Sequence, residues 1–153
     1  MGNGFLLLGY DATTAEFSGM APGTAGAFAV NDYMGMVARS ASPANPAAVR
    51  IDFGQPRLTD TVAVLEVFSR NTAFGVSIAI GNDASFATFS EQVDCTPAAN
   101  EFRSQSGLQH AVARFTPALV RYVLVQVRGD GVFLPQFSRI VAGLRLEPQR
   151  NFS

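Results

Sequence analysis

Apolar and polar residues alternate in short runs along this chain, and turn-forming residues close most of the runs. The segment 49–53, VRIDF, points its apolar residues one way and its charged residues the other, which is the period-two pattern of a strand with one buried face. Gly54-Gln55-Pro56 follows, and because proline cannot donate a hydrogen bond to a neighbouring strand, we expect the strand to end there. The next run, TVAVLEVF at 61–68, is apolar on nearly every residue and predicts an inner strand covered on both faces.

The same signals predict further strands at short spacing, each bounded by Gly, Pro, Asn or Asp. Thr116-Pro117 is expected to separate two of them. In SFATFSEQV the two phenylalanines break strict alternation, which indicates a bulge. The polar stretch from 94 to 109 predicts a long loop. The strands expected outside 49–68 are 5–8, 76–81, 85–93, 111–115, 118–128 and 139–147.

Many short strands with turns at this spacing predict an all-β fold, a two-sheet antiparallel β-sandwich with jelly-roll or Greek-key closure. A chain of 153 residues suits one domain with a sizeable core. The Ser-, Ala- and Pro-rich stretch at 39–48 is typical of a connecting loop. We therefore expect residues 1–48 to form an N-terminal strand and an irregular segment packed on the body. Residues 49–153 are expected to form the β-sandwich body.

Three stretches resemble the discoidin or galactose-binding-like β-sandwich family: VRIDFGQPRLTDTVAVLEV, RFTPALVRYVLVQVRG and RIVAGLRLE. The first looks like that family's strand–turn–strand, the second like its strand before a glycine turn, and the third like its closing strand. The resemblance covers about 49–147 and implies a jelly-roll, galactose-binding-like sandwich. The sugar-binding members commonly stack a tryptophan on the sugar ring, and this chain has no Trp.

The opening GNGFLLLGYDA, followed by ARSASPANPAAVRIDFG, is also similar to small phage structural proteins that pair such a start with a sandwich. This second resemblance implies a virion component. The expected component is a head decoration, tail or fibre-associated protein.

Composition narrows the classes of partner. Charged residues are 15% of the chain and hydrophobic residues 48%, so the surface is covered either by uncharged polar side chains or by partner subunits, and we favour partners. The net charge is -1, and Asp52 and Asp60 are interleaved with Arg50 and Arg57, which argues against binding nucleic acid. No apolar run approaches the roughly 20 residues that span a bilayer, so no membrane partner is expected.

The residues that carry catalysis or bind metals are scarce. Cys95 and His110 are the only Cys and His, so they supply neither a zinc site nor a specified catalytic pair. Oxygen ligands for calcium exist singly, and turn chemistry explains them equally well. We expect no enzyme activity, no cofactor and no metal. The candidate calcium ligands are Asn82, Asp83, Asp94 and Asp130.

One connection is unusually apolar for a solvated turn, GDGVFLPQFSR at 129–139. Exposed apolar patches mark interaction sites, which makes this loop a candidate docking surface. The alternative is that Phe133 or Phe137 folds back and plugs the open end of the sandwich. The segment SRNTAFG at 69–75 is expected at the same end. The candidate interaction residues are Arg70, Asn71, Phe74, Val132, Phe133, Leu134 and Phe137.

These observations predict a non-enzymatic phage virion structural protein that acts through protein–protein contacts. We expect its partners to be other virion subunits. We expect the protein to be an oligomer and to be located in the virion. The alternative is a carbohydrate- or receptor-binding module of a phage or bacterial adhesin, with a surface glycan bound by the same loops.

Overall fold

The computed structural model describes residues 6–22, 29–30, 37–67, 75–95, 109–129, 131–132 and 134–146. In these ranges the regular elements are antiparallel strands, apart from a 3₁₀ turn at 29–30. No helix in the described part of the chain is long and apolar enough to cross a membrane. The strands are β1 (Leu6–Gly9), β2 (Thr14–Ser18), β3 (Ala38–Arg39), β4 (Ala47–Val67), β5 (Gly75–Gly81), β6 (Glu91–Asp94), β7 (Gln109–Arg128), β8 (Gln136–Phe137) and β9 (Arg139–Leu146).

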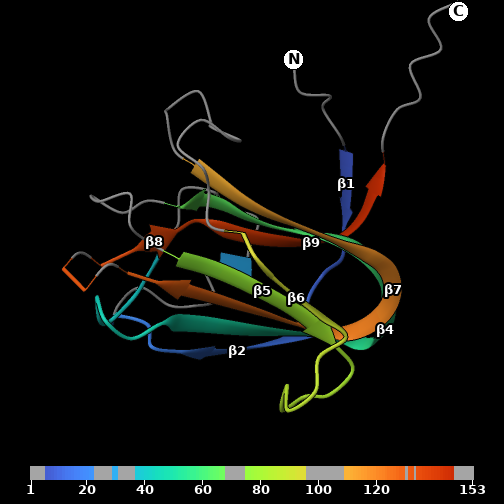
Figure 1. Ribbon diagram of the computed structural model, residues 1–153, viewed down its shortest axis with the longest axis horizontal. Coiled ribbons are helices and arrows are strands. Elements are labelled where there is room, and N and C mark those ends of the chain that lie inside the picture. Colours follow the sequence, from blue (N-terminus) through green and yellow to red (C-terminus); the bar gives the residue numbers. More distant parts are fainter. Residues whose placement is uncertain are drawn as a thin grey trace, which may run out of the picture.

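Two long strands, β4 and β7, pair with each other and run through both layers of a sandwich (Figure 1). In layer one, residues 47–52 of β4 lie between β2 and the second half of β7, and β5 and β6 follow. In layer two, residues 61–65 of β4 lie between β9 and the first half of β7, and β1 pairs with β9. The predicted two-sheet antiparallel β-sandwich is therefore confirmed.

The bend between the layers lies where the sequence predicted strand ends. β4 does not stop at Gly54-Gln55-Pro56, and β7 does not split at Thr116-Pro117, so both predictions were wrong. The pairing instead shifts register between Asp52 and Arg57 and again between Thr59 and Thr61. Both prolines fall inside these shifts, where the ladder requires no N–H from them.

Gly54 enables this bend because its φ is +75°, a left-handed conformation that glycine adopts without steric cost. A Cβ at this position would also lie 2.8 Å from Oγ1 of Thr13, in the segment that leads into β2. The bend and the N-terminal section are therefore packed against each other.

The N-terminal section contributes more regular structure than the sequence predicted. β1 pairs with β9 along layer two, and β2 pairs with β4 along layer one. β2 lies in the part of 1–48 that the sequence predicted to be irregular. Residues before 49 thus supply strands to both layers, whereas the proposed division of the chain at 48/49 stays a prediction.

The core consists of the inward faces of the two layers. Valine and isoleucine side chains dominate the buried face of layer one. In layer two, valines of β4 lie beside smaller alanines of the neighbouring strands β7 and β9. The run 59–64 of β4 is buried on both faces, which confirms the inner strand predicted there. The central buried residues are Val49, Ile51, Val62, Val64, Ile78, Ile80, Ala111, Ala113, Val123, Val125, Val127, Ile140 and Ala142.

Phe137 belongs to this core. It lies in β8, which pairs with β3 in a small separate sheet, and its side chain is fully buried. Phe137 is therefore not available as a docking residue, and the prediction that it is one was wrong. The alternative, that it folds back into the sandwich, agrees with its burial. Val132 and Leu134 of the same connection are exposed, and Phe133 lies outside the described residues.

A strained contact joins the far ends of β4 and β7. Glu66 has φ of +53°, and its N–H donates a hydrogen bond of 3.0 Å to Nδ1 of His110. Burial lowers the pKa of His110 below its usual 6.5, against the opposing charge of Glu66. The imidazole must be unprotonated at Nδ1 to accept this bond, so the fold favours neutral His110.

Replacing Phe137 tests its place in the core. Phe137→Ala is expected to lower the free energy of unfolding by about 3–5 kcal/mol, because it leaves a cavity between packed side chains. Val132→Ala in the same connection removes an exposed side chain and should change stability by less than about 0.5 kcal/mol. Urea unfolding curves of the two variants give the comparison. Equal, small effects would show that Phe137 is not packed.

The pH dependence of stability tests the Glu66–His110 contact. The unfolded chain binds a proton at His110 near pH 6.5, whereas the folded chain binds it only at lower pH. The free energy of unfolding should therefore fall as pH drops through about 6.5 and level off below the folded pKa. His110→Gln should remove this dependence in urea titrations between about pH 7.5 and 5. Parallel curves for the wild type and the variant would contradict the assignment.

Candidate functional site

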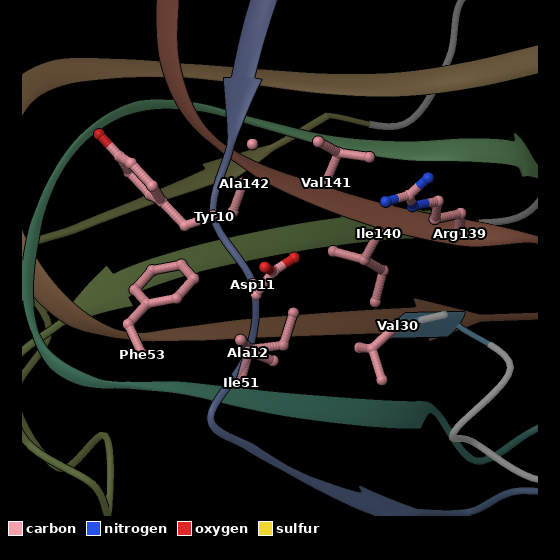
Figure 2. Close-up of a pocket in the computed structure, with 11 residues that line it drawn as sticks. Tyr10, Asp11, Ala12, Val30, Ile51, Phe53, Arg139, Ile140, Val141 and Ala142 are labelled. Atoms are coloured by element: carbon pink, nitrogen blue, oxygen red, sulfur yellow. The ribbon is translucent and has the colours of Figure 1, made fainter. Parts of the chain in front are cut away.

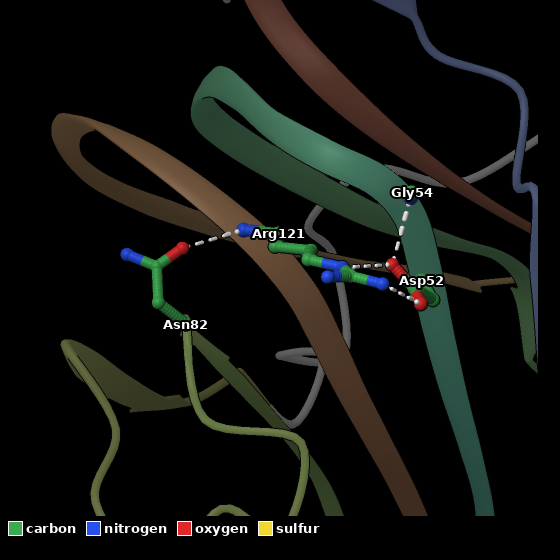
Figure 3. Close-up of polar contacts among 4 residues, drawn as sticks. All are labelled: Asp52, Gly54, Asn82 and Arg121. Atoms are coloured by element: carbon green, nitrogen blue, oxygen red, sulfur yellow. Dashed lines mark hydrogen bonds and ion pairs between the residues drawn. The ribbon is translucent and has the colours of Figure 1, made fainter.

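The loop 82–90, which follows β5, is anchored at its first residue to the bend of β7 (Figure 3). Oδ1 of Asn82 accepts the N–H of Arg121 at 2.9 Å, and its amide donates to the carbonyl of Leu119 at 3.1 Å. Arg121 in turn reaches Asp52 of β4 through Nε at 2.8 Å and Nη2 at 2.9 Å. Asp52 also accepts the N–H of Gly54 at 2.7 Å. The bend, both long strands and the loop are thus fixed to one another.

Arg121 and Asp52 form a bidentate pair, which is the geometry that arginine makes best with a carboxylate. The Arg121 hydrogen bond is the main reason that the pKa of Asp52 lies below its usual value, and the N–H of Gly54 adds to it. The pair is partly exposed, so its role is to set geometry more than to add stability.

The interior of the loop is held by its own side chains. Asp83 accepts the backbone N–H of Ser85 at 3.0 Å and that of Thr88 at 3.3 Å, and its pKa is lowered by these bonds. This is the Asx-type turn that aspartate favours. Arg50 of β4 donates to the carbonyl of Ala84 and pairs with Glu16 of β2. The loop is therefore tied down onto the outer face of layer one.

Phe86 has φ of +51°, a conformation uncommon outside glycine, and its ring lies 6.4 Å from that of Tyr122 at 72°. The sequence placed Phe86 and Phe89 in a strand over 85–93. That prediction was wrong, because the strand β6 begins only at Glu91. The loop instead carries both rings beside the outer face.

Three adjoining hollows lie on this outer face, with volumes of about 230, 120 and 240 Å³. The first two share Phe86 and Leu124, and the last two share Ser77, Gln92 and Gln126. We call the three together the outer-face groove. Its remaining lining residues are Glu16, Phe17, Ser18, Pro46, Ala48, Arg50, Gly75, Val76, Ala79, Ala84, Ser85, Phe89, Asp94 and Arg128.

The centre of the outer-face groove combines apolar and uncharged polar groups. Phe89 lines this part of the groove and is 48% exposed. Oγ of Ser77 donates to Oε1 of Gln126 at 3.4 Å across β5 and β7. Gln92 is exposed on β6. Amide and hydroxyl groups both donate and accept, so this surface suits a ligand with many hydroxyl groups and an apolar face.

A larger cavity of about 300 Å³ opens between the two layers (Figure 2). The segment Tyr10–Ala12 crosses it from β1 to β2. The Tyr10 ring lies 5.8 Å from Phe53, edge to face, and its hydroxyl donates to the carbonyl of Leu58 at 2.9 Å. Val30 also lines the cavity, and residues on both sides of 29–30 lie outside the described ranges. The groove is the better defined site for that reason.

Cys95 and His110 do not form a nucleophile–base arrangement. His110 contacts the backbone of Glu66, whereas Cys95 follows β6 and donates its N–H to Val76 of β5. Burial, aided by the charge of Asp94, raises the pKa of the Cys95 thiol to about 12. The thiol is thus protonated at neutral pH and is a weak nucleophile.

Within the described ranges no cluster of three or more His, Cys, Asp or Glu side chains could hold a metal ion. Among the candidate calcium ligands, Asn82 and Asp83 are occupied by the loop contacts above, and Asp130 lies outside the described residues.

The predicted interaction connections adjoin one end of the outer-face groove, because Gly75 and Arg128 line its third hollow. Gly75 at the start of β5 pairs with Arg128 at the end of β7, so β5 begins and β7 ends at the same end of layer one. That end is opposite the bend (Figure 1). Exposed there are Val132 and Leu134, while Arg70, Asn71 and Phe74 lie outside the described residues. The interaction role of this end stays a prediction.

Comparison with known protein families found no matching family model, and no curated protein sequence matches the chain. Solved structures do match. A chitosan-binding module from a chitosanase/glucanase of Paenibacillus sp. IK-5 has a TM-score of 0.63 at 15% identity, over 90% of this chain and 98% of that one. A Streptococcus pneumoniae fucose-binding module has a TM-score of 0.64 at 14% identity, over 94% and 98%.

The module CBM32-3 from a family 31 glycoside hydrolase of Clostridium perfringens has a TM-score of 0.65 at 16% identity, over 88% of this chain and 94% of that one. Identities this low show a shared fold and no more. The chain therefore has the galactose-binding-like β-sandwich fold that the sequence predicted.

Proposed function

We propose that this chain is a non-catalytic carbohydrate-binding module and that its outer-face groove holds the glycan. The observation that carries the proposal is the half-exposed Phe89 beside Ser77, Gln92 and Gln126, in a groove that residues of loop 82–90 line. A sugar ring has one apolar CH face and a rim of hydroxyl groups. An aromatic face next to amide and hydroxyl side chains is complementary to both.

The chain lacks tryptophan, the side chain that sugar-binding relatives of this fold commonly stack on a sugar. Phe89 would supply the apolar face in its place, and Phe86 lines both of the first two hollows. Because a phenylalanine ring is smaller and has no N–H, orientation of the ligand would depend on the neighbouring amides.

The shared fold supports this proposal. Structures of this fold include a lectin domain of lectinolysin in complex with Lewis b antigen and a CBM32 module in complex with an unsaturated mannuronic acid. Those ligands belong to those proteins. A protonated Cys95 and a His110 engaged with backbone agree with a binding role in place of catalysis.

A second candidate is the virion structural protein that the sequence first predicted. Its specific support is the apolar connection at the end opposite the bend, where Val132 is 71% and Leu134 39% exposed. Contact with other virion subunits would cover these side chains. Neither the comparisons nor the fold bears on a phage origin. Light scattering of the purified chain tests this candidate. It would be weakened if the wild type stayed monomeric at high concentration, or if Leu134→Ser left an oligomer unchanged.

Glycan-array screening followed by calorimetry tests the carbohydrate-binding proposal. Phe89→Ala should weaken binding about five- to tenfold, because it removes about 1 kcal/mol of contact with the sugar face. Leu146→Ala is the matched control, since Leu146 is 42% exposed on β9 in layer two. It should leave the affinity unchanged. A silent array, or equal effects of the two substitutions, would contradict the proposal.

A further inference from the structure

We infer that the outer-face groove takes a linear, electrically neutral glycan, bound along several sugar units of its chain. This inference rests on the proposed function and adds the class of ligand. It follows from two features of the groove, its extent across the strands and the distribution of charge along it.

The groove is extended because it follows rows of outward-facing residues across layer one. Glu16, Arg50, Leu124, Ala79 and Gln92 are paired in that order across β2, β4, β7, β5 and β6. Adjacent strands lie about 4.8 Å apart, so this row spans about 19 Å. Two hollows follow one another along this row, and the third adjoins the second over β5, β6 and β7, toward Gly75 and Arg128. An elongated ligand fills such a shape better than a single ring.

No single hollow is large enough to enclose a ligand by itself. The largest is about 240 Å³, below the roughly 300–1,000 Å³ typical of pockets that enclose small molecules. Affinity must therefore accumulate over adjoining hollows. Phe86 and Phe89 line the middle one, where a sugar unit inside the chain would lie.

The middle of the groove carries no formal charge. Its hollow is lined by Ser77, Ala79, Phe86, Phe89, Gln92, Leu124 and Gln126.

Charged side chains stand only toward the two ends of the groove, and there the signs are mixed. Arg50 pairs with Glu16 and donates to the carbonyl of Ala84, so its charge is already opposed by a carboxylate of the protein. The other end has Asp94 and Arg128. A chain with a carboxylate or an ammonium on every sugar would lose water in the middle hollow without meeting an opposite charge. A neutral chain avoids that loss.

Calorimetry with chains of graded length tests the inference. The probes are cello-, laminari-, manno- and xylo-oligosaccharides from disaccharide to hexasaccharide, with alginate and chitosan oligosaccharides of the same lengths. For at least one neutral series, affinity should rise by about tenfold or more from disaccharide to hexasaccharide. It should change little with salt, since no ion pair is made. The charged series should bind more weakly.

Gln92→Ala and Phe89→Ala should each reduce the affinity for the hexasaccharide more than for the disaccharide. Gln92 is exposed, so its substitution should leave the fold intact, which urea unfolding verifies. Tight binding of a single sugar that both substitutions weaken, with no gain from length, would overturn the inference and leave the proposed function in place. Binding that neither substitution weakens would overturn both. Preference for a charged series with strong salt dependence would overturn its neutrality. Binding of no glycan, neutral or charged, would overturn the proposed function as well.

Discussion

The continuous pairing of β4 with β7 is the constraint on which the rest of the structure depends. The two strands stay hydrogen-bonded from layer one, around the bend, into layer two. The inward faces of both layers therefore come from the same two strands, which aligns the valines of β4 with the alanines and valines of β7. The layers cannot slide past each other without breaking this ladder. A change of register by one residue would also turn the buried faces of the strands toward solvent.

The same bend determines where the candidate site lies. Asn82, the first residue of the loop 82–90, forms hydrogen bonds with Leu119 and Arg121 of β7. Arg50 of β4 donates to the carbonyl of Ala84 in the same loop. A loop that is fixed at both places overlies layer one and cannot fold away from it. The outer-face groove is thus a consequence of long-range contacts, in which residues far apart in the sequence meet only once the bend has formed.

The sequence predicted the strands whose faces alternate, because burial of one face imposes the period of two that 49–53 and 139–142 show. It failed at Pro56 and Pro117, which fall in register shifts where a missing N–H does not matter. It also failed at Phe86 and Phe89. Local composition there resembles a strand, whereas the tertiary contacts of Asn82 and the turn at Asp83 impose a loop. No local signal placed Ser77, Gln92 and Gln126 beside those rings, since that proximity depends on strand order.

The predicted docking connection shows a related limit. Phe137 and Val132 look alike in a polar–apolar pattern, yet one is fully buried and the other is exposed. Pairing of β8 with β3, which no pattern in either segment indicates, decides the difference.

The central claim is that the bent β4–β7 pair presents a glycan-binding groove on the outer face of layer one. An NMR titration of the isotopically labelled chain with a neutral hexasaccharide tests it most directly. The account predicts that the largest chemical-shift changes fall on the amides of Ser77, Gln92 and Gln126 and on loop 82–90. Changes confined to Tyr10–Ala12 or to 131–134, or no change with any glycan, would contradict it.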